Sequence, residues 1–215
     1  MKNKITSQKL IRWGGLAAML AGFIYAGIQP IHPPDFLPSV TTPAWAIIMP
    51  FKMIMCLLFM LGITGIYARQ TEETGGLGLA GYLMLGLSWA LQTAFIFTEA
   101  FILPVLATPN PDYVESLLGI VNGFPGTMNI GALPAIYGVV GVTYILGNLL
   151  FGIAVFHAHV LPRWTGGLLA IAALLTPAAA LLPHALQRYA AIPVGIAMIA
   201  MGISLFFGDQ EINTH

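Results

Sequence analysis

Six long apolar stretches dominate the chain, and prolines, charges and polar clusters separate them. A helix needs about 20 mostly apolar residues to cross the roughly 30 Å hydrocarbon core of a bilayer. None of the stretches alternates apolar and polar residues in the way that a transmembrane barrel strand does. The pattern predicts an all-α, polytopic transmembrane bundle with six spans: Trp13–Gln29, Ala44–Ala68, Leu77–Leu103, Leu133–Phe156, Thr165–Leu182 and Tyr189–Phe207.

The composition supports a membrane protein and excludes several other classes. Of the 215 residues, 58% are apolar and 7% are charged, whereas a soluble domain carries roughly 25% charged residues. Eight basic and eight acidic residues give no net charge. So few charged side chains cannot cover a water-exposed surface or form a nucleic-acid footprint. We therefore expect one transmembrane domain over residues 1–215, with membrane lipid as a partner and no nucleic acid.

The basic residues predict the orientation of the spans. With the N-terminus inside the cell, six of the eight lie on cytoplasmic segments, in agreement with the positive-inside rule: Lys2, Lys4, Lys9, Arg12, Arg69 and Arg163. Lys52 and Arg188 then lie toward the outside. Both termini are predicted to be cytoplasmic, and the outer connections are residues 30–43, 104–132 and 183–188.

The longest outer connection, residues 104–132, contains a segment with helical character. Residues 112–121 predict a short helix with Leu117, Leu118 and Val121 on one side. Prolines and glycines flank it, which is typical of hinges and loop ends. Both a lid over the bundle and a helix lying on the bilayer surface fit this pattern.

Several short segments carry a resemblance to known proteins. They are His32-Pro33-Pro34-Asp35, Thr42-Pro43-Ala44-Trp45, Gly65-Ile66-Tyr67-Ala68-Arg69-Gln70, Thr98-Glu99-Ala100-Phe101 and Val160-Leu161-Pro162-Arg163-Trp164. In these segments the chain resembles a functionally uncharacterised group of small bacterial polytopic membrane proteins. The resemblance implies a multi-pass protein of the bacterial cytoplasmic membrane and implies no catalytic residue.

Lys52 and Glu99 are the ionisable residues placed inside predicted spans. A charge at the bilayer centre costs at least about 2.5–3.5 kcal/mol, so such residues are functional candidates. Their spans are consecutive and antiparallel, and both residues lie about one or two helical turns from the outer end. The spacing allows an ion pair in the outer leaflet. The alternative is that Lys52 extends to the headgroups and Glu99 is protonated.

Further polar residues are expected near the same place. Ser88 and Gln92 share one helix face with Glu99, at i, i+4 and i+11, and a polar face favours the bundle interior. His32 and Asp35 follow the first span, and His184 and Arg188 flank the last outer connection. Since these groups lack local metal-ligand spacing, we predict a ligand site and no metal site. Its expected residues are Glu99, Lys52, Gln92, Ser88, His32 and His184.

Small residues at helical spacing predict close helix contacts in three spans. They are Gly14, Ala18 and Gly22 in the first span, Gly138, Gly141 and Gly152 in the fourth, and Gly195 and Gly202 in the sixth.

Three functional hypotheses remain after the motif search. The chain has no Gly-x-Ser-x-Gly elbow, no phosphate-binding loop and no His-Glu-x-x-His motif, and no pattern indicates a particular cofactor. We expect binding or transport of a small, lipid-like or amphipathic molecule in an outward-facing pocket, and a transporter of this size often works as a homo-oligomer. The alternatives are an enzyme using Glu99 as general acid or base on a lipid-soluble substrate, or a structural or regulatory subunit.

Overall fold

The computed structural model describes residues 6–124, 126–179, 181–182 and 184–208, and in these ranges the chain is all-α without a strand. This confirms the all-α part of the predicted fold class. The long helices are α1 (Ser7–Ile28), α2 (Pro43–Arg69), α3 (Thr71–Phe97), α6 (Leu133–Ala158), α7 (Arg163–Ala179) and α9 (Ile192–Phe207). Shorter elements join them: η1 (Leu37–Ser39), the π-helical turn η2 (Thr98–Ile102), α4 (Leu103–Leu106), α5 (Pro111–Asn122), α8 (His184–Gln187) and η3 (Arg188–Ala191).

Within the described ranges, five helical segments are long and apolar enough to cross a membrane. They are Ser7–Ile28, Pro43–Arg69, Thr71–Leu106, Leu133–Ala158 and Arg188–Phe207. The predicted fifth span corresponds to α7, which has 17 residues in the described part of the chain and a length of roughly 25 Å. The structure thus supports a helical membrane protein with five clear candidate spans.

Local sequence explains where several helices begin and end. The side-chain oxygens of Thr6, Thr42 and Asn110 each accept a hydrogen bond from the backbone N–H three residues later, at 3.3 Å. These bonds satisfy N–H groups that a helix start otherwise leaves unpaired. Proline occupies the first position of both α2 and α5, where its missing N–H costs nothing. Gly123, with φ of 71°, ends α5 in the left-handed conformation that favours glycine.

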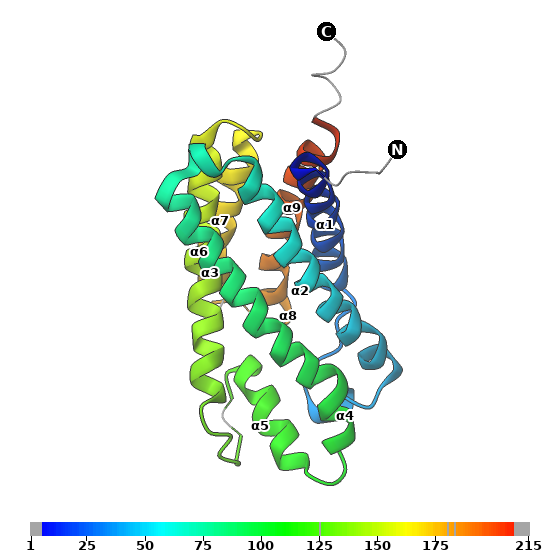
Figure 1. The fold of residues 1–215 in the computed structure, drawn as a ribbon. Helices are drawn as coiled ribbons and strands as arrows, with labels where there is room; N and C mark the ends of the chain where they lie inside the picture. Colours follow the sequence, from blue (N-terminus) through cyan, green and yellow to red (C-terminus); the bar gives the residue numbers. More distant parts are fainter. Residues whose placement is uncertain (1–5, 125, 180, 183, 209–215) are drawn as a thin grey trace, which may run out of the picture.

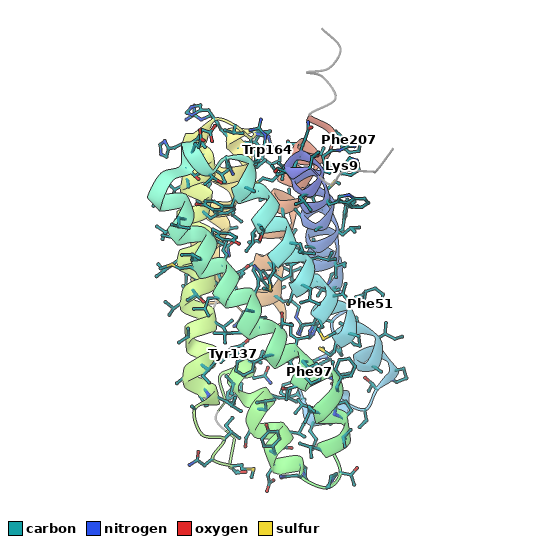
Figure 2. The ribbon with its side chains drawn as sticks, in the orientation of Figure 1. Lys9, Phe51, Phe97, Tyr137, Trp164 and Phe207 are labelled. Atoms are coloured by element: carbon teal, nitrogen blue, oxygen red, sulfur yellow. The ribbon has the colours of Figure 1, made fainter. Side chains whose placement is uncertain are left out.

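The long helices form a closed ring in the order α1, α2, α3, α6, α7 and α9, with α9 returning to α1. Figure 1 shows the beginning of α1 and the end of α9 at the same end of the bundle, with α4 and α5 at the opposite end. Arg12 near the start of α1 donates a hydrogen bond of 3.2 Å from Nε to the carbonyl of Phe206 near the end of α9. Figure 2 labels Lys9, Trp164 and Phe207 at this end. We call it the terminal end and the other the cap end.

Glycines bring the helices close together toward the terminal end. A Cβ on Gly15 of α1 would lie 2.9 Å from the carbonyl oxygen of Gly202 in α9, and one on Gly152 of α6 would lie 2.7 Å from that of Gly166 in α7. Such distances are too short for any side chain, so the helices approach through their backbones. The expected close contacts are absent at Gly138 and Gly141 of α6, where an added Cβ would meet no atom within 4 Å.

At the cap end, α5 packs on the protein. Its residues Val114, Leu117 and Leu118 are buried in an apolar cluster that includes Trp45 of α2 and Leu103 of α4. The side-chain amide of Asn122 also donates a hydrogen bond to the backbone carbonyl of Asp35, which ties α5 to the loop after α1. The helix therefore lies against α4, η1 and α6.

Candidate functional site

A cavity of about 430 Å³ lies inside the ring, toward the cap end. Its wall comes from α1, α2, α3, α6, α7 and the α8–η3 segment, and Val121 of α5 also reaches it. Gly141 of α6 is one of the lining residues, and its missing side chain leaves room there. Every long helix of the ring except α9 thus contributes directly to one internal space.

Aromatic side chains form one part of the cavity wall. The Trp89 ring stacks on Phe59, with centroids 4.1 Å apart and an interplanar angle of 4°. The rings of Tyr25 and Tyr144 each meet Trp89 edge to face with centroids at 5.8 Å, and their hydroxyls are 3.0 Å apart. Tyr25, Trp89, Tyr144 and Tyr137 all line the cavity, and Tyr137 is labelled in Figure 2. These mutually packed rings offer a rigid surface for an apolar or aromatic ligand group.

Lys52 is the central polar residue of the site. Its Nζ lies 3.3 Å from Glu99 Oε2, which makes an ion pair, and 3.0 Å from His32 Nε2. The Lys52 side chain is 15% exposed and that of Glu99 is 5% exposed. An ammonium group has three N–H donors, and among the described residues the structure gives Lys52 no third acceptor. Because Lys52 lines the cavity, its remaining N–H is available to a ligand there.

The hydrogen bonds of His32 fix its protonation. Its Nδ1 lies 2.6 Å from the carbonyl oxygen of Pro33, which only accepts, so Nδ1 carries the proton. Burial, followed by the positive charge of Lys52, lowers the pKa of His32 to about 4. The ring is therefore neutral at pH 7, and Nε2 accepts the hydrogen bond that Lys52 donates. His32 thus orients the ammonium group of Lys52 by a hydrogen bond and adds no charge of its own.

Glu99 occupies a π-helical turn whose cause is local. The backbone N–H of Leu103 bonds to the carbonyl of Thr98, five residues earlier, and Pro104 has no N–H to offer. The Glu99 carbonyl therefore lacks a partner within its own helix. The indole Nε1 of Trp45, which is fully buried, donates to this carbonyl at 2.8 Å. Such π-turns are frequent at functional sites.

The carboxyl group of Glu99 does not reach the cavity surface. Glu99 is 4% exposed and is absent from the cavity wall, whereas Lys52 lines it. Glu99 was expected among the ligand-contacting residues, but it lies behind Lys52. Its direct contact is the ammonium group, so in this structure it neutralises and orients Lys52.

The other predicted site residues have different positions. Ser88 and Gln92 line the cavity, but the Ser88 hydroxyl donates to the Val140 carbonyl at 3.0 Å and so joins α3 to α6. The Gln92 amide has no hydrogen-bond partner among the described residues. Asp35 and Arg188 also line the cavity. His184 begins α8, and its side chain lies outside the described part of the structure.

Sequence reasoning missed the aromatic wall, although a signal for it was present. Tyr144 lies in the middle of a predicted span, where a hydroxyl group in hydrocarbon needs a hydrogen-bond partner. Tyr25 of α1 supplies that partner. The helix positions alone do not indicate which two spans face each other, so the pair becomes visible only in the folded ring.

The described residues contain no group of three or more His, Cys, Asp or Glu side chains that could hold a metal ion. Comparison with protein-family models, with curated proteins and with solved structures found no match to the chain. The cavity and its residues are therefore the features of the molecule that indicate a function.

Proposed function

We propose that this chain is an integral membrane protein that binds or transports a small or amphipathic molecule in the cavity beside Lys52. The observation that carries the proposal is the 430 Å³ cavity, walled by five ring helices and the α8–η3 segment. Ligand sites typically have volumes of about 300–1,000 Å³ and combine apolar walls with a few placed polar groups. A bundle whose polar residues served only to hold helices together has no need of such a space.

The chemistry of the wall favours a molecule with an apolar and a polar part. Trp89, Met55 and Ile96 present apolar surface, while Lys52 and Gln92 present hydrogen-bonding groups that the described residues leave incompletely paired. An unpaired polar group in a low-dielectric interior costs free energy until a ligand or water satisfies it. The ligand's polar part is therefore expected at Lys52 and its apolar part at Trp89.

The position of Glu99 argues against its use as a general acid or base on a bound substrate. Such a group must come within hydrogen-bond reach of the proton that it transfers. A molecule in the cavity meets Lys52 first, because Glu99 lies behind the ammonium group. Binding or transport is therefore the better supported function.

We further propose that the protein spans a bacterial cytoplasmic membrane six times, with both termini in the cytoplasm. The shorter helix α7 completes the ring between α6 and α9, which supports its assignment as a span. Lys9, Arg12, Arg69 and Arg163 gather at the terminal end, as the positive-inside rule requires of a cytoplasmic face. Single cysteines at the exposed positions Thr71 and Glu115 in a Cys56→Ala background test the orientation. We expect an impermeant thiol reagent to leave position 71 of intact cells unlabelled, and its labelling there would contradict the topology.

Filling the cavity tests the proposed function. Gly141→Leu places a side chain into the cavity without meeting an atom within 4 Å at Cβ. Gly138→Leu, one turn earlier on α6, adds the same side chain at an exposed position away from the cavity and is the matched control. Native mass spectrometry from mild detergent should find a retained small molecule or lipid in the parent and in Gly138→Leu, and its loss in Gly141→Leu. Equal retention by all three proteins, with unchanged thermal unfolding midpoints, would contradict binding in this cavity.

A further inference from the structure

Two opposite charges at the cavity lack an oppositely charged partner among the described residues. Asp35 is 8% exposed and lines the cavity, yet its carboxylate has no hydrogen bond or ion pair among the described residues; only its backbone carbonyl is bonded, to Asn122. Arg188 donates from one guanidinium nitrogen to the carbonyl of His32 at 2.8 Å. No described carboxylate comes within the 4.0 Å of Arg188 that defines an ion pair.

These two charges are held around one residue. His32 accepts from Lys52 through Nε2 and from Arg188 through its backbone oxygen, and the charge of Asp35 also acts on its ring. Asp35, Lys52 and Arg188 therefore flank the same histidine at the cavity. Asp35 and Arg188 do not contact each other, so the site keeps a positive and a negative group apart.

The charge balance restricts what the site can bind. Lys52 is compensated by Glu99, His32 is neutral at pH 7, and Asp35 and Arg188 together contribute no net charge. A ligand with only an anionic group would leave the Asp35 carboxylate unpaired, and a ligand with only a cationic group would leave Arg188 unpaired. Asp35 is buried, and leaving a buried charge without a partner is strongly unfavourable. Arg188 is half-buried, so it gains less from pairing than Asp35 does. A molecule that carries both charges and no net charge pairs both residues.

We propose that the ligand of this cavity is a zwitterion, whose cationic group pairs with Asp35 and whose anionic group pairs with Arg188 and the free N–H of Lys52. Its apolar part lies against Trp89. This inference rests on the proposed function, because it names the chemistry of the molecule that the cavity binds. A free amino-acid-like compound and a zwitterionic lipid headgroup share this chemistry.

Matched probes test the charge requirement with the full chain in an uncharged detergent. One set shares a phenyl ring: phenylalanine with both charges, phenylethylamine with the cation, and phenylpropionate with the anion. The second set shares a hexyl tail: hexylphosphocholine with both charges, hexyltrimethylammonium, and hexyl phosphate. Isothermal titration at pH 7 should show that the zwitterion of at least one set binds at least about tenfold more tightly than its single-charge relatives. A preference for the zwitterion in the phenyl set indicates a free amino-acid-like compound as the ligand. The same preference in the hexyl set indicates a zwitterionic lipid headgroup.

Variants of Asp35 and Arg188 test whether these two residues cause the preference for a zwitterion. Asp35→Asn should remove the preference for the zwitterion over the anion, and Arg188→Gln should remove its preference over the cation. Because the Asp35 carboxylate has no partner to lose among the described residues, Asp35→Asn is expected to fold. Asp112→Asn removes an exposed charge from α5 at the same end and should leave all affinities unchanged.

The possible results separate this inference from the function that it extends. Equal affinity across a set, preference for a single charge, or no binding by either zwitterion overturns the zwitterion proposal. Stabilisation by sodium ion alone that depends on Asp35 also overturns it, because the carboxylate would then be a cation site. If a singly charged probe binds and Gly141→Leu abolishes that binding, the cavity function stands while the zwitterion proposal fails.

Discussion

Two pairs of glycines in the ring helices, in different parts of the bundle, have opposite surroundings. Toward the terminal end, Gly15 and Gly152 lie against the backbones of neighbouring helices, where no side chain fits. Toward the cap end, Gly138 and Gly141 meet no atom within 4 Å of an added Cβ, and Gly141 faces the cavity. The same residue type therefore closes one part of the ring and leaves space in the other.

This difference shows how a small membrane protein makes an internal cavity. In lipid no hydrophobic force drives helices together, so backbone packing and polar contacts decide how closely they approach. At the terminal end small residues allow close crossings. At the cap end, buried aromatic rings and the Lys52–Glu99 pair occupy the space between α1, α2, α3 and α6. We infer that these bulky and charged groups keep the helices apart around the cavity.

The largest effect is expected from Lys52→Met, which removes the cation at the centre of the cap end. Glu99 would remain 4% exposed with no described cation within ion-pair distance. Stranding a buried charge in this way costs about 3–5 kcal/mol. The free energy of unfolding, measured in mild detergent at pH 7, should fall by this amount.

The double variant Lys52→Met with Glu99→Gln is the control for that prediction. It removes both charges, so its loss of stability should be smaller than the sum of the losses from the two single variants. If the loss of stability in the double variant equals the sum of the losses in the two single variants, the residues are not coupled. The cap end would then owe its shape to packing alone.

A smaller loss of stability is expected from adding one methyl group at the terminal end. A Cβ at position 15 would lie 2.7 Å from Leu205 Cβ and 2.9 Å from the Gly202 carbonyl, so α1 and α9 must separate. Gly15→Ala should cost about 1–3 kcal/mol, as overpacking of a tight contact does. Gly138→Ala, the matched change at an exposed and open position of α6, should be neutral or slightly stabilising. Equal thermal unfolding midpoints for the two variants would contradict the difference in packing between Gly15 and Gly138.

The sequence was sufficient to predict the all-α class and an approximate position for every long helix. Apolar runs of membrane length identify such helices because lipid leaves the backbone few alternatives. Exact ends were harder to predict. The third predicted span stops at Leu103, whereas the helical segment continues through a π-turn to Leu106. Pro104 was visible as a break, but the sequence does not show that Trp45 satisfies the carbonyl released beside it.

The candidate site was harder to predict than the fold. The depths of Lys52 and Glu99 could be estimated from helix spacing, and the structure brings them to 3.3 Å. Whether Glu99 faces the cavity or lies behind Lys52 depends on the rotation of α2 against α3, which apolar spans with little amphipathic character do not encode. The same rotation decides which aromatic rings gather around Trp89. These features follow from packing among several helices and were therefore not visible in the chain alone.

The smallest effect concerns pH and should be confined to the cap end. The pKa of His32 is about 4 in the folded protein, whereas that of an unfolded histidine is about 6.5. Between these values the unfolded chain takes up the proton first, so acid favours unfolding, and stability falls as the pH falls from about 6.5 to about 4. Because the His32 ring is only partly buried, we expect a total loss of about 1–2 kcal/mol from this group.

His32→Gln isolates this contribution from the carboxyl groups that titrate over the same range. The amide oxygen of glutamine can still accept from Lys52, but the side chain takes up no proton. As the pH falls from 6.5 to 4, the free energy of unfolding of the parent should therefore fall more steeply than that of His32→Gln. His157→Gln makes the same substitution at an exposed ring of the terminal end, away from Lys52, and is the matched control. Parallel profiles for the parent and His32→Gln would mean that the ring is not held neutral beside Lys52, and the assignment of Nε2 as the acceptor for the ammonium group would have to be abandoned.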